Sequence, residues 1–252
     1  MKLGIVGKGG VGKTTVAALV ARAYRERGAR VVAIDTDSNP NLGLSLGLTL
    51  AETDAVPVLP RSVIVGSGGD HTVGGLIDEF GRHTPAGVTL LSAIRVVEAG
   101  AGCTCSGHAT VRTLLGEVLD ARADTTIVDM EAGLEHLSRS GGTLAHVDAL
   151  VMVMEPSRKS VVTAVRTAAL AEELGIPRTV GLGNKSRGED DAAFLRAAAA
   201  EHGIELIGVL PYRAGVARSD RDGGDAGGVD AELRALVGGV LDALEGAGRV
   251  AV

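Results

Sequence analysis

Short apolar runs alternate along the chain with longer stretches in which apolar residues recur at helical spacing. The short runs are typical of strands buried in a parallel sheet, and the longer stretches are typical of amphipathic helices. We expect strands at residues 2–7, 30–35, 87–93, 124–130, 147–155, 178–185 and 204–211. We expect helices at residues 13–28, 109–122, 158–175, 189–203 and 229–245.

This alternation predicts an α/β fold, a mostly parallel, doubly wound sheet with helices on both faces and right-handed crossovers. The 252 residues suffice for one large domain with a sizeable core, and no stretch has the length of a linker. We therefore expect a single domain over residues 1–252. Residues 51–72 are the least regular part of the chain, and we expect them to form a surface excursion.

The composition excludes several classes of function. Hydrophobic residues make up 45% of the chain but aromatic residues only 2%, which argues against binding nucleic acid by stacking bases on rings. The net charge of -6 and the absence of a basic run predict no nucleic-acid partner and no anionic membrane surface. No run approaches the roughly 20 apolar residues of a membrane span, and the apolar start is too short for a signal peptide. We expect a cytoplasmic protein whose two cysteines are free thiols.

The first predicted strand and helix enclose a phosphate-binding motif. The segment GKGGVGKTT matches the pattern G-x-x-x-x-G-K-[ST] in the strand–helix context that the pattern requires. Glycines let the backbone approach phosphates, and the helix start adds unpaired N–H groups. Lys13 would neutralise the β- and γ-phosphates and the Thr14 hydroxyl would bind Mg²⁺. The motif predicts a P-loop ATPase whose ATP site includes Gly7, Lys8, Gly9, Gly10, Val11, Gly12, Lys13, Thr14 and Thr15.

A second lysine, Lys8, stands at the start of this loop. The string KGGVGKTT resembles the deviant Walker A motif of the MinD/ParA/nitrogenase-iron-protein class. The resemblance implies an ATP-dependent homodimer in which Lys8 reaches the partner's phosphates, much as an arginine finger does. The alternative is that Lys8 is only a solvated charge on the loop.

Acidic residues follow two predicted strands. Asp35 and Asp37 end one strand and Asp129 ends another, where open α/β sheets bind ligands. Asp129 would hold Mg²⁺ through water, and Gly133 would leave room for the γ-phosphate. The resemblance assigns orientation of the attacking water, and contact with the Mg²⁺ shell, to Asp37, with Asp35 supporting that shell. A lone aspartate here would otherwise be a helix cap or turn residue.

Two further strand ends carry candidate base-binding residues. Asn184 and Lys185 end the strand at 178–185, and Pro211 ends the strand at 204–211. In related ATPases an asparagine amide at such a position reads the adenine edge, and the segment VLPYR around Pro211 would flank the base. A loop-capping asparagine is the alternative.

Cys103 and Cys105 form a Cys-x-Cys pair beside glycines and just before a predicted helix. Ni²⁺ or Zn²⁺ normally takes four ligands, so one chain offers half a site. A two-fold dimer would bring two pairs together and complete it. The alternative is two neighbouring buried cysteines that act as small apolar residues.

The strings GKGGVGKTT, CTCSGHATVRTLL and VDMEAGLEHL together resemble CooC-type ATPases, which mature the nickel–iron–sulfur cluster of carbon monoxide dehydrogenase. The resemblance implies a cytoplasmic metallochaperone ATPase that dimerises on nucleotide, binds metal through Cys103 and Cys105, and delivers nickel to an apo-metalloenzyme client. His108 would be at most an auxiliary ligand. The segments at 36–41 and 51–72 differ most and leave the client open.

Two other functions compete with this interpretation. A positioning or partition ATPase of the MinD/ParA type needs a basic DNA-binding face or an amphipathic membrane tail, and the sequence has neither. A reductase-like switch with an iron–sulfur cluster between subunits would have cysteines far apart in the sequence.

Overall fold

The computed structural model describes residues 1–60, 72–95, 111, 115, 123–132, 144–222 and 230–246. Its strands are β1 Lys2–Gly7, β2 Val31–Asp35, β3 Arg82–His83, β4 Thr89–Ser92, β5 Thr125–Asp129, β6 Ala149–Met154, β7 Thr179–Ser186 and β8 Leu206–Pro211. Its helices are α1 Lys13–Glu26, α2 Leu42–Ser45, α3 Leu50–Asp54, α4 Val73–Phe80, α7 Arg158–Glu173, α8 Glu189–Glu201, α9 Ala214–Asp222 and α10 Ala231–Gly246.

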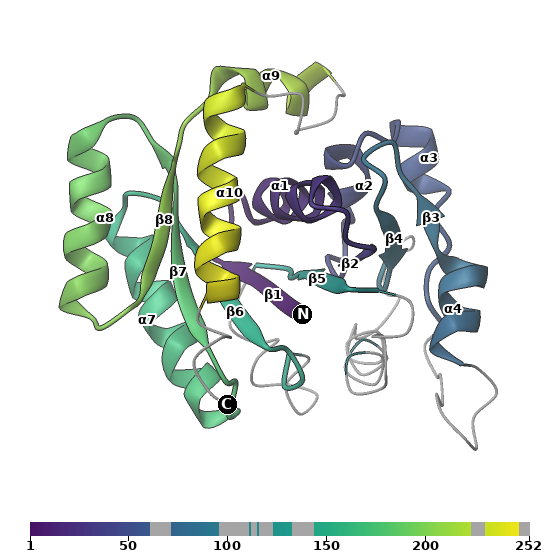
Figure 1. Cartoon of the computed structure of the whole chain (residues 1–252), viewed down its shortest axis with the longest axis horizontal. Coiled ribbons are helices and arrows are strands. Elements are labelled where there is room, and N and C mark those ends of the chain that lie inside the picture. The colour runs from purple at the N-terminus through teal and green to yellow at the C-terminus, as the bar shows by residue number, and fades with distance from the viewer. Residues whose placement is uncertain are drawn as a thin grey trace.

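The described strands form one eight-stranded sheet in the order β3-β4-β2-β5-β1-β6-β7-β8. Every pairing is parallel except that of β3 with β4, so the predicted mostly parallel α/β sheet is confirmed. Strand β1 lies between β5 and β6, and its carboxyl end leads directly toward α1 (Figure 1). Ligands of such sheets bind outside the carboxyl ends of the strands.

Each face of the sheet carries its own apolar core, as the alternation of side chains along a strand requires. On β1, Leu3 and Ile5 face the core shared with α1 and α10, whereas Val6 faces the core shared with α7 and α8. All six residues of β6 are buried between these layers, which explains why its sequence ALVMVM is a continuous apolar run.

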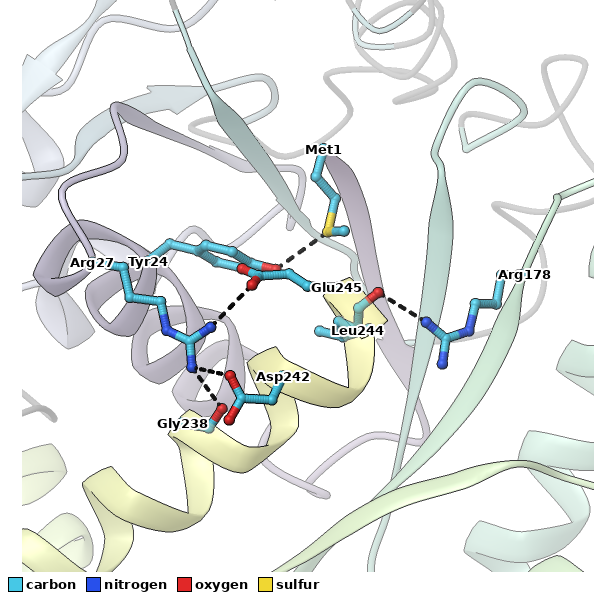
Figure 2. A network of polar contacts seen from close by, with 8 residues as sticks. All are labelled: Met1, Tyr24, Arg27, Arg178, Gly238, Asp242, Leu244 and Glu245. Atoms are coloured by element: carbon cyan, nitrogen blue, oxygen red, sulfur yellow. Dashed lines mark hydrogen bonds and ion pairs between the residues drawn. The ribbon is translucent and has the colours of Figure 1, made fainter. Parts of the chain in front are cut away.

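Two arginines from other elements bind the C-terminal half of helix α10 (Figure 2). Arg27, which follows α1, donates to the Gly238 carbonyl at 2.9 Å and pairs with Asp242 at 2.6 Å. Arg178, which precedes β7, donates to the Leu244 carbonyl near the helix end at 3.0 Å. The Leu244 carbonyl lies in the last turn of α10, where carbonyls have no intrahelical partner, and Arg178 satisfies it. The last helix is thereby fixed to the helix that begins at the phosphate loop.

The sequence pattern missed the short elements. It predicted neither α2, α3, α4, α9 nor the antiparallel edge strand β3. The expected surface excursion at 51–72 is wrong for its first part, because Val56 and Leu59 are buried and Val58 bridges to Ser92. Of the helix expected at 109–122, the structure describes only Val111 and Leu115, which are both helical and fully buried.

None of the helices among the described residues is both long enough and apolar enough to span a membrane.

Candidate functional site

The loop between β1 and α1 has a backbone that only glycine can follow at several positions. Gly10 and Gly12 have φ of 84° and 93°, in the left-handed region. A Cβ on Gly12 would lie 2.6 Å from the amide nitrogen of Asn184. No side chain caps the start of α1, so its first N–H groups are left for an external acceptor. The loop therefore has the backbone of an anion site.

Two consecutive side chains of β7 hold this loop. Asn184 Nδ2 donates to the Val11 carbonyl at 2.8 Å, and Lys185 Nζ donates to the Gly10 carbonyl at 2.5 Å. The amide nitrogen of Asn184 is therefore engaged by the loop, which fixes the orientation of its side chain.

An irregularity in β7 explains how neighbouring residues reach the same target, since successive side chains of a regular strand point to opposite faces. The register with β8 shifts between Gly183 and Ser186. Within it, Lys185 has φ of 61°, the only positive value at a non-glycine among the described residues. Such a bulge re-aims side chains, and the left-handed conformation costs about 1–2 kcal/mol. The strand thus stores strain where it grips the phosphate loop.

Most of the predicted ATP residues line one cavity of about 490 Å³. The predicted residues in its wall are Gly9, Gly10, Gly12, Lys13, Thr14, Thr15, Asp37, Asn184, Lys185 and Pro211. Leu210, Tyr212 and Arg213, from the segment VLPYR that was expected to flank the base, also line it. The sequence did not mark the other wall residues, which are Leu19, Ala132, Val216, Ala217 and Leu233. Val216 and Ala217 belong to α9, so the turn after β8 was the available signal.

The remaining predicted residues of the loop lie outside the cavity wall. Gly7 ends β1, and Val11 is fully buried beneath the loop. Lys8 is half-buried, with Nζ 3.5 Å from the Gly9 carbonyl. Among the described residues it has no carboxylate partner, so its charge is available to another molecule.

Asp129 at the end of β5 is a buried carboxylate with an unused oxygen. It is 1% exposed, and its Oδ1 has no hydrogen-bond partner. Burial and the neighbouring Asp35 raise the pKa of Asp129 well above its usual value, against the opposing effects of Thr14 and Lys13. An orphaned buried oxygen between a hydroxyl and an ammonium group fits a ligand to the shell of Mg²⁺.

Asp35 binds backbone N–H groups with both of its carboxylate oxygens. Its Oδ1 accepts the Asp37 N–H at 3.0 Å, and its Oδ2 accepts the Leu42 N–H at 2.9 Å. Both oxygens of Asp35 therefore hold the loop that carries Asp37, and its expected support of the metal shell stays a prediction. Burial raises the pKa of Asp35 to about 6.

Lys13 is surrounded by acids and is 8% exposed. Burial lowers its pKa, while Asp129, Asp37 and Glu131 favour its charged form. Glu131 was not among the predicted site residues. It accepts a hydrogen bond from Ser38 Oγ at 2.9 Å. Its place two residues after Asp129 was the available signal.

The predicted residues Cys103, Cys105, His108 and Gly133 lie outside the described residues. Within the part of the chain that the structure describes, no three His, Cys, Asp or Glu side chains gather as a metal site.

The raised pKa of Asp35 predicts a pH-dependent stability. Because its pKa rises from 3.8 to about 6 on folding, the folded state retains the proton over that range, and stability falls as the pH rises through it. At about 1.4 kcal/mol for each pH unit, the loss approaches roughly 3 kcal/mol. Asp35→Asn removes this effect, so its unfolding free energy relative to wild type should rise by about 2–3 kcal/mol between about pH 4 and pH 7.5.

Urea denaturation without nucleotide or Mg²⁺ measures this difference. A difference that stays constant over the same pH range would contradict the buried-carboxylate account.

Comparison with known proteins places this geometry in a family. The model of the CobQ/CobB/MinD/ParA nucleotide binding domain matches residues 5–225. The carbon monoxide dehydrogenase accessory protein CooC of Rhodospirillum rubrum is 36% identical over 239 residues, which cover 88% of each chain. An uncharacterized ATP-binding protein of Methanocaldococcus jannaschii is also 36% identical, over 87% of this chain and 88% of its own.

Among solved structures, the septum site-determining protein MinD of Pyrococcus horikoshii, complexed with Mg-ADP, superposes with a TM-score of 0.75. The superposition covers 99% of this chain and 97% of that one, at 19% identity, and supports the fold. The chain belongs to the CobQ/CobB/MinD/ParA family of nucleotide-binding domains and is a CooC-like member of it.

Proposed function

We propose that this protein is a cytoplasmic, Mg²⁺-dependent ATPase that dimerises on ATP and delivers nickel to a client such as carbon monoxide dehydrogenase. The observation that carries the proposal is the glycine loop with buried Lys13 beside Asp129, whose buried Oδ1 has no hydrogen-bond partner. The likeness to CooC over 88% of the chain supports the choice of client.

The phosphate end of the cavity has the groups that ATP hydrolysis needs. Lys13 and the free N–H groups at the start of α1 would bind the β- and γ-phosphates. Thr14 and Asp129 would hold Mg²⁺, which when bound neutralises phosphate charge. Asp37 lines the same cavity and is held in place by Asp35, so it is the residue proposed to orient the attacking water.

Lys8 is proposed to act across the dimer. It stands beside Gly9 and Gly10, both exposed, and has no carboxylate partner in the described structure. A lysine at the exposed rim of the loop can reach the phosphates bound by a second copy. In such a two-fold dimer, Cys103 and Cys105 of each subunit would together supply four thiolates for Ni²⁺ or Zn²⁺, with His108 as an auxiliary ligand.

A positioning role like that of MinD receives less support. Helix α10 carries Glu232, Asp242 and Glu245 against a single arginine, Arg234. An amphipathic membrane-binding helix would have a basic polar face.

Lys8→Ala tests the dimer. Without the second lysine, ATP should no longer drive association, and hydrolysis should fall at least about 100-fold. Light scattering coupled to gel filtration and phosphate release measure both effects, with Lys159→Ala, an exposed lysine on α7, as the matched control. Wild-type turnover in Lys8→Ala would refute the trans role.

Cys103→Ser/Cys105→Ser tests the cargo site. Wild type loaded with Ni²⁺ or Zn²⁺ should retain about one ion per nucleotide-bound dimer, and the double variant should retain none. Metal analysis after gel filtration, with and without ATP, gives the stoichiometry. If the double variant retains as much metal as wild type, the proposed carrier role is excluded. ATP hydrolysis should persist in the double variant in either case.

A further inference from the structure

Two loops leave the same edge of the sheet side by side. Strands β2 and β5 pair in parallel, and their last residues, Asp35 and Asp129, are register partners (Figure 1). The loop after β2 carries Asp37, and the chain after β5 continues with Met130. The ladder between the strands ends here, so contacts beyond it must fix one loop relative to the other.

Two hydroxyl groups of the loop after β2 make these contacts. The Thr36 hydroxyl donates to the Asp129 carbonyl at 2.8 Å, and the Thr36 N–H donates to the same carbonyl at 3.0 Å. The Ser38 hydroxyl donates to Oε1 of Glu131 at 2.9 Å. Asp37 lies between Thr36 and Ser38 in the sequence. The residue proposed to orient the attacking water is therefore held on both sides by β5 and the residues that follow it.

Glu131 also acts on this site through its charge, but that effect is shared. Burial lowers the pKa of Lys13, and three neighbouring carboxylates oppose this shift. Glu131 opposes it least, after Asp129 and Asp37. Its hydrogen bond to Ser38 is the contribution that the other two carboxylates do not make.

We propose that Glu131 is a positioning residue for ATP hydrolysis, which acts through Ser38 to hold Asp37 in place. This inference rests on the proposed function, in which Asp37 orients the attacking water. Residues 36–41 form neither helix nor strand, so fixing their conformation costs backbone entropy. A hydrogen bond to a carboxylate is about twice as strong as one between neutral groups, so Glu131 is well suited to offset that cost.

Removing either partner should slow turnover without weakening nucleotide binding. Ser38→Ala and Glu131→Ala should each lower kcat about 5- to 30-fold, because Asp37 is then held less firmly. The KM for ATP and the Kd for MgADP should stay within about threefold of wild type. The Ser38→Ala/Glu131→Ala double variant should lose no more than either single variant, because all three lack the same hydrogen bond. Phosphate release and calorimetry measure these quantities.

Glu131→Gln separates the hydrogen bond from the charge. The amide oxygen of glutamine can still accept from Ser38, so kcat should stay within about threefold of wild type. Asn39→Ala is the control in the same loop, because the hydrogen bonds of Asn39 in the described structure come from its backbone. This control should match wild type in kcat and KM.

Hydrogen exchange without nucleotide gives a second readout, which does not depend on turnover. Peptides that cover residues 36–41 have the same sequence in wild type and in both Glu131 variants. Their amides should exchange faster in Glu131→Ala, where the loop opens more often, and at the wild-type rate in Glu131→Gln.

The contrary outcomes are distinct. Equal losses of kcat in Glu131→Ala and Glu131→Gln, additive losses in the double variant, or a rise in KM with kcat unchanged would overturn the positioning role and leave the proposed ATPase intact. A wild type that does not hydrolyse ATP would overturn the proposed function and this inference with it.

Discussion

The conformation of the glycine loop is the constraint on which the rest of the site depends. A loop that points its N–H groups at phosphates needs left-handed residues at Gly10 and Gly12 and would collapse without support. Support comes from a distant strand, because Asn184 and Lys185 hold the carbonyls that the loop turns outward. Holding the loop in this way requires the strained, left-handed backbone of Lys185. The pairing of β7 with its parallel neighbour β6 offsets the free energy of that strain.

The carboxylates show a second compromise between stability and function. Asp35 and Asp129 are register partners on β2 and β5, so two acids are buried side by side. Asp35 satisfies its oxygens with backbone N–H groups and organises the loop that carries Asp37. In contrast, Oδ1 of Asp129 is buried without a hydrogen-bond partner. Leaving a buried carboxylate oxygen unpaired costs stability, which is why Asp129 is the residue proposed to bind the shell of Mg²⁺.

Local patterns predicted the sheet and the phosphate loop, because a buried strand, a glycine turn and a helix are adjacent in the sequence. They also brought Asn184 and Pro211 to the site, since parallel strands end at one edge. The bulge at Lys185 was beyond them, because it arises from register between two strands. Val216 and Ala217 were overlooked because α9, which carries them, has few apolar residues to mark a helix. The contact of Asp35 with the N–H of Leu42 could not be predicted, because the two residues are seven apart in the sequence and meet only in the folded loop.

Whether the open oxygen of Asp129 serves Mg²⁺ is the most direct test of this account. Calorimetry of ADP binding, with Mg²⁺ and with chelator, can be compared between wild type and Asp129→Asn. We expect Mg²⁺ to strengthen ADP binding by wild type at least about tenfold, or 1.4 kcal/mol, and to have no effect on the variant, which should retain its metal-free affinity. An undiminished effect of Mg²⁺ on Asp129→Asn would contradict the account.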